Sequence, residues 1–167
     1  MQYAPGQIGL DQAKVQSFME RRKEEQSLPL ALAAGVVAAL VGAAIWAVIT
    51  VTTQFQIGWM AVGVGFLVGY AVQYLGKGMG KEYQYVGALC ALLGCLLGNY
   101  FVAVGFAAQS LHMDFFALLP RIPVEKIPSL MQDTFQPMDL LFYAIAVYEG
   151  YRFSLKRITR EELSALQ

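Results

Sequence analysis

Three long apolar runs without a charged residue constrain this chain more than any other feature. They cover residues 30–51, 57–75 and 85–108, which are 22, 19 and 24 residues. As helices rising 1.5 Å per residue, they would be about 33, 28 and 36 Å long. About 20 apolar residues suffice to cross the hydrocarbon core of a bilayer. The sequence therefore predicts an all-α integral membrane protein.

The composition agrees with a chain surrounded by lipid. Hydrophobic residues make up 57% of the 167 residues and charged residues 14%, against about 45–50% and about 25% in soluble domains. The 12 basic and 12 acidic residues cancel. A nucleic-acid partner would require a basic surface, so none is expected. The expected partners are membrane lipid and either further copies of this chain or other membrane-protein subunits.

A fourth, shorter run covers residues 138–154 and carries Asp139, Glu149 and Arg152 near its ends. Lys and Arg concentrate in cytoplasmic segments. With four spans, ten of the 12 basic residues lie on one side and only Arg121 and Lys126 on the other, whereas three spans would divide them six and six. We therefore predict four transmembrane helices, at about 30–51, 57–75, 85–108 and 138–154, with both termini in the cytoplasm.

Three further parts lie outside these spans. Residues 1–28 are predicted to form a cytoplasmic amphipathic arm with a helix over 11–26, and residues 155–167 a short cytoplasmic helix. Residues 109–137 combine four prolines with many large apolar side chains, which predicts a non-cytoplasmic cap of short interfacial helices. The transmembrane domain, cap included, covers 29–154. The arm is either a docking helix or a helix on the membrane or bundle, and the cap either a lid or a packing element.

Small residues recur at helical spacing within the three runs. Helices in lipid associate closely where small side chains let their backbones approach. The stripes therefore predict helix-packing or oligomer interfaces, and the pattern is compatible with contacts inside one chain or between copies. The glycines concerned are Gly35, Gly42, Gly58, Gly63, Gly65, Gly69, Gly87, Gly94 and Gly98.

Polar residues inside the spans are few. Asn99 and Gln73 are the intramembrane candidates, either as links between helices or as part of a pore shared by several copies. Glu149 and Arg152 are three residues apart, a spacing that predicts an ion pair at the cytoplasmic boundary. The sequence contains no recognisable catalytic, cofactor-binding or metal-binding arrangement, so we expect a chain that is not an enzyme and holds neither cofactor nor metal.

One part of the sequence resembles a known pattern. The run IGWMAVGVGFLVG at 57–69, the turn with glycines and lysines after it, and residues 92–98 resemble small, uncharacterised bacterial multispan membrane proteins. The resemblance covers about a third of the chain. It implies a location in the bacterial inner membrane and transfers no functional residue.

The leading hypothesis is a non-catalytic scaffold or subunit of a membrane assembly that self-associates through its glycine-rich helix faces. Two alternatives stay open. One is an oligomeric channel or passive pore with Asn99 or Gln73 in a ring, which single-channel recording would detect. The other is a subunit of a lipid- or quinone-handling enzyme that uses the cap as a lid, which a co-purifying lipid would support.

Overall fold

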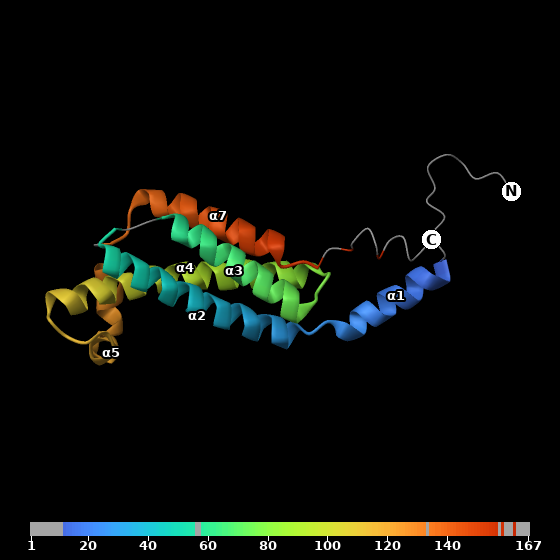
Figure 1. Ribbon diagram of the computed structural model, residues 1–167, viewed down its shortest axis with the longest axis horizontal. Coiled ribbons are helices and arrows are strands. Elements are labelled where there is room, and N and C mark those ends of the chain that lie inside the picture. Colours follow the sequence, from blue (N-terminus) through green and yellow to red (C-terminus); the bar gives the residue numbers. More distant parts are fainter. Residues whose placement is uncertain (1–11, 56–57, 133, 157, 159–161, 163–167) are drawn as a thin grey trace.

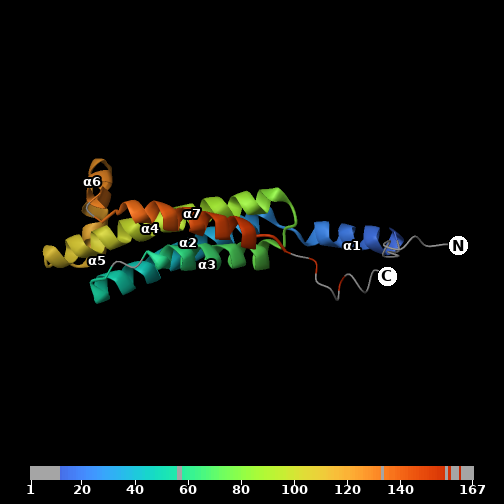
Figure 2. The ribbon, with the colours of Figure 1, turned by 90° about the horizontal axis from the view of Figure 1, so that it is seen from above.

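The structure is a computed structural model that describes residues 12–55, 58–132, 134–156, 158 and 162. These residues form helices and connecting segments and contain no strand. Four long helices lie side by side: α2 (Leu28–Thr53), α3 (Trp59–Gly76), α4 (Lys81–Ser110) and α7 (Pro137–Phe153) (Figure 1). Beyond one end of this bundle lies α1 (Gln12–Glu25), and the cap helices α5 (Phe115–Leu118) and α6 (Ile127–Gln132) lie at the opposite end (Figure 2).

Three of these helices are long and apolar enough to cross a membrane. They are α2, α3 and α4, whose 18-residue windows reach mean hydropathies of 2.5, 1.3 and 2.0. The predicted all-helical fold is confirmed, with three helices that have the length and hydropathy of membrane spans. The shorter helix α7 has 17 residues and lies lengthwise against α3 and α4.

Local sequence explains where the long helices begin and end. Ser27 caps α2, because its Oγ accepts a hydrogen bond from the Leu30 N–H at 3.4 Å. Pro29 occupies the first turn, where a missing N–H costs nothing. Both α2 and α3 end at residues with left-handed backbone, Gln54 at φ 57° and Lys77 at φ 49°. Short connections follow, so successive helices are antiparallel neighbours.

The turn between α3 and α4 joins three parts of the chain. The Ser27 N–H donates to the Gly76 carbonyl oxygen at 3.1 Å, and the Lys156 N–H donates to the Gly78 carbonyl oxygen at 3.0 Å. The buried Tyr83 ring occupies the space that a side chain at Gly78 would need. The turn is therefore a junction that holds the start of α2 and the segment after α7.

The structure shows how the helices extend beyond the predicted spans and how the cap is divided. Helix α4 contains the span predicted at 85–108 and continues to Lys81 at one end and Ser110 at the other. Only four residues form α5, followed by the 3-10 turns η1 (Leu119–Arg121) and η2 (Val124–Lys126). Pro120 and Pro123 explain the interruptions, because proline lacks an N–H and restricts the residue before it. Residues 1–11 of the arm and most of the predicted C-terminal helix lie outside the described residues.

Candidate functional site

Eight of the nine predicted interface glycines face other helices of their own chain. A Cβ built on Gly65 would lie 2.5 Å from the Ala146 carbonyl oxygen, and one on Gly94 would lie 2.6 Å from a Val64 methyl carbon. The other six face Cys90 (Gly35), Val64 (Gly42), Phe142 (Gly58), Phe153 (Gly69), Ser154 (Gly87) and Trp46 (Gly98). Because one chain fills these faces, they offer no free surface for the self-association that the same glycines also suggested.

Helices α4 and α7 approach each other closely at a glycine that the sequence pattern did not single out. Gly150 on α7 faces Gly87 on α4, and a Cβ on Gly150 would lie 2.6 Å from the Gly87 carbonyl oxygen. One turn earlier, Ala146 lies against Gly65 of α3. The spacing of Ala146 and Gly150, four residues apart, was the available signal that α7 packs closely against two neighbours.

Gly63 is the exception among the predicted glycines. It is exposed, and no atom of another helix lies within 4 Å of a Cβ built there. It belongs to the outer surface of the bundle, which is rich in large apolar side chains. Examples from the other long helices are Val37, Val41, Val48, Leu89, Leu140 and Leu141.

Asn99 is 1% exposed and connects the bundle to the cap. Its Oδ1 accepts a hydrogen bond from the Thr134 hydroxyl at 2.9 Å. Its amide lies beside the hydroxyl of Tyr143, which donates to the Cys95 carbonyl oxygen at 3.2 Å. We name Asn99, Thr134 and Tyr143 the cap-anchor cluster. Asn99 thus faces the interior of a single chain and not a ring of several copies.

The other polar candidates also make contacts within the chain. Gln73 is half-buried, and its Nε2 donates to the Leu155 carbonyl oxygen at 2.5 Å. Among the residues that the structure describes, no ion pair joins Glu149 and Arg152. Arg152 donates to the Tyr148 hydroxyl at 3.5 Å, and its guanidinium lies 5.9 Å from the ring centroids of both Tyr148 and Phe153. Helical spacing allowed the pair, but aromatic faces on both sides attract the guanidinium instead.

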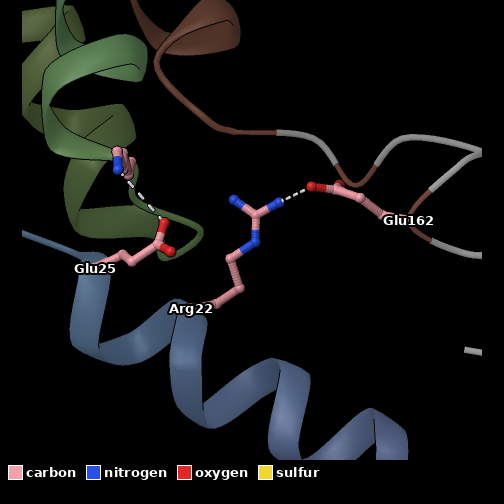
Figure 3. A network of polar contacts seen from close by, with 4 residues as sticks. Arg22, Glu25 and Glu162 are labelled. Carbon is pink, nitrogen blue, oxygen red and sulfur yellow. Dashed lines mark hydrogen bonds and ion pairs between the residues drawn. The ribbon is translucent and has the colours of Figure 1, made fainter. Parts of the chain in front are cut away.

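Two ion pairs connect α1 with other parts of the chain (Figure 3). Arg22 pairs with Glu162, and Lys77 Nζ lies 3.5 Å from Glu25 Oε2. Arg22 is buried, and its guanidinium lies 5.1 Å from the centroid of the Phe18 ring. Most other side chains of α1 are exposed, and the helix points away from the bundle instead of lying along it (Figures 1 and 2).

An apolar cleft of about 540 Å³ lies at the cap end of the bundle, between α2, α4 and the cap. Its polar lining residues are Thr52, Gln109 and Asp114. The remaining walls are Ala44, Ala47, Val48 and Val51 of α2, Phe101, Gly105 and Ala108 of α4, and Met113, Phe115, Phe116 and Leu119 of the cap. No sequence motif marks the cleft, because it combines ordinary apolar residues from separate segments.

Comparisons of this chain with protein families, with curated proteins and with solved structures find no match. The resemblance to bacterial multispan membrane proteins therefore stays a prediction.

Proposed function

We propose that this chain is a four-span, non-catalytic subunit of a bacterial inner-membrane assembly that docks a partner subunit through α1. The observation that carries the proposal is the position of α1, which continues away from the end of the bundle (Figures 1 and 2). It has 14 residues, a length at which an isolated helix is marginal in water without tertiary packing. A partner that packs on α1 would supply that packing.

Two features of α7 support its assignment as a fourth span, its packing against α3 and the burial of its charged residue Asp139. Gly58 faces Phe142 and Gly69 faces Phe153, so α7 follows α3 over most of its length. Asp139 near the start of α7 is buried and accepts a hydrogen bond from the Gln136 N–H at 2.8 Å. The Asp139 carboxylate is therefore hydrogen-bonded at the start of the helix and shielded from the surrounding lipid. With four spans, the positive residues place both termini in the cytoplasm.

The surface of α1 that we assign to the partner carries charges of both signs. Glu20, Arg21, Lys23 and Glu24 are exposed. An anchor for anionic lipid would be predominantly basic, whereas alternating charges can pair with a complementary protein surface. The proposed occupant of this surface is therefore a protein subunit.

The positions of Asn99 and Gln73 favour assembly over the channel alternative. Asn99 bonds to Thr134 and Gln73 to the Leu155 backbone, both within one chain. A ring of copies would need these side chains on the outer surface of the bundle. Neither is placed there, so the two residues that suggested a pore lend it no support.

The test is native mass spectrometry of the full chain, extracted with its surrounding lipid from its own membranes. We expect the wild-type chain to retain a partner subunit in fixed stoichiometry. The double variant Glu20→Lys with Arg21→Glu should reduce that retention at least tenfold. This exchange keeps the number of Lys and Arg residues in the arm, and therefore the orientation signal, unchanged.

The matched control is the same kind of exchange in the cap, Glu125→Lys with Lys126→Glu. Both residues are exposed and adjacent, as Glu20 and Arg21 are. The control variant should retain the partner as the wild type does. A wild-type chain that is released as a lone monomer, or a partner that survives the exchange in α1, would contradict the proposal.

A further inference from the structure

The cleft between α2, α4 and the cap has mainly apolar walls. We infer that it binds one alkyl chain of a membrane amphiphile whose polar end is a hydroxyl or ammonium group. Eleven of its 14 lining residues are apolar, and its volume of about 540 Å³ falls within the range of small-molecule sites. The inference goes beyond subunit docking and requires only that α2 and α4 lie in the membrane.

The exposed residues that line the cleft indicate that it opens toward lipid. Val48 on α2 is 62% exposed and Phe116 on α5 is 78% exposed, and both line the cleft. Val48 belongs to a helix whose apolar window has a mean hydropathy of 2.5. The cleft therefore opens on the side of the bundle that faces lipid, where alkyl chains are the abundant ligand.

Size distinguishes an alkyl chain from a helix of another protein. A helix about 10 Å across fills about 400 Å³ in each turn. The cleft, at about 540 Å³, would hold little more than one turn. An alkyl chain is much thinner than a helix, so the same volume accommodates a far longer stretch of it.

The polar residues of the cleft select the end group. Two glutamine amides at this end are hydrogen-bonded within the chain. Gln54 Nε2 donates to Gln109 Oε1 at 2.8 Å, and Gln109 Nε2 donates to the Val51 carbonyl oxygen at 3.3 Å. Asp114 is the one charged residue among those that line the cleft. Its Oδ1 caps α5 by accepting from the N–H groups of Phe116 at 2.9 Å and Ala117 at 3.3 Å. The negative charge repels an anionic head group, and Oδ2 can accept from a hydroxyl or ammonium group.

The test is photolabelling of the full chain in phosphatidylcholine nanodiscs. The probe is a 16-carbon alcohol that carries a diazirine and a terminal alkyne. We expect adducts on residues 44–52 and 101–119 at least fivefold above those on residues 85–96, which also form apolar surface. The corresponding 16-carbon carboxylate should label the cleft at least threefold less than the alcohol.

A matched pair of substitutions on α2 separates binding in the cleft from general contact with lipid. Ala44 and Ala33 are both exposed, and only Ala44 lines the cleft. Ala44→Trp should reduce cleft labelling at least fivefold, while Ala33→Trp should leave it unchanged. Val48→Trp gives a second blocking variant at a highly exposed position, and gel filtration with thermal unfolding checks that each variant is folded.

Three results would overturn the inference. They are uniform labelling of the apolar surface, unchanged labelling in both folded tryptophan variants, and crosslinks from the cleft to a second protein chain. Each is independent of partner retention through α1, which is measured without the probe. Failure of the ligand site is therefore distinguishable from failure of the proposed function.

Discussion

Gly63 and Gly65 lie two residues apart on α3 but meet opposite surroundings. A Cβ on Gly65 would lie 2.5 Å from the backbone of α7, whereas one on Gly63 would have no neighbour within 4 Å. Two steps along a helix rotate the side chain by about 200°, so the two glycines face opposite sides. Glycine spacing shows which residues share a face, and only the packing of neighbours decides whether that face is inside.

The same contrast holds for the whole bundle. Its interior consists mainly of small residues, and the backbones of α3, α4 and α7 nearly touch where Gly65 meets Ala146 and Gly87 meets Gly150. The outer surface carries large apolar side chains. Substitutions that enlarge a side chain should therefore be costly inside and nearly neutral outside.

The largest expected effect comes from isoleucine at the two glycines of α3. Gly65→Ile should lower the free energy of unfolding by about 3 kcal/mol or more, because its Cβ would collide with the α7 backbone. Gly63→Ile should change it by less than about 0.5 kcal/mol, as surface substitutions usually do. Reversible unfolding in mixed micelles measures both values. Equal losses would show that the inner and outer faces of α3 have been assigned wrongly.

Alanine sharpens the comparison with a single added methyl group. Gly150→Ala should cost about 2 kcal/mol, because the new Cβ would lie 2.6 Å from the Gly87 carbonyl oxygen. Gly63→Ala should instead stabilise the chain by up to about 1 kcal/mol, since alanine is the better helix former. The same unfolding measurement compares them. A stabilising Gly150→Ala would mean that α4 and α7 are not in close contact there.

The cap-anchor cluster should show a smaller effect. Thr134→Val removes the donor to Asn99 Oδ1, and leaving a buried acceptor unpaired should cost about 1 kcal/mol. Hydrogen exchange should also become faster in residues 127–132. Ser129→Ala is the control, because its hydroxyl bonds within the exposed cap. If the Thr134 variant behaved like the control, the hydrogen bond from Thr134 to Asn99 would not be what holds the cap to the bundle.

The smallest effect is expected at the exposed ion pair between Lys77 and Glu25. Both side chains are more than two-fifths exposed, so solvent screens their attraction. Glu25→Gln should change the free energy of unfolding by less than about 0.5 kcal/mol at any salt concentration. A loss above about 1 kcal/mol in low salt would show that α1 is held firmly to the bundle.

Much of the bundle could be predicted from the sequence, but the apolar cleft could not. The apolar runs located α2, α3 and α4 within a few residues, because a membrane span is a local property of length and hydropathy. The helices of the cap were less predictable, because prolines 120 and 123 divide an apolar segment into short turns. No pattern in the sequence marks the cleft, because its walls come from residues far apart in the chain.

The sequence by itself determined the class of this protein, the position of its apolar helices and the set of glycines that can bring helices together. Tertiary structure decided which partner each residue meets. It placed Asn99 against Thr134, turned Gly63 outward, and brought Arg152 to aromatic rings instead of Glu149. The physical reason is that hydropathy and helical periodicity act along the chain, whereas contacts depend on how whole helices rotate against one another.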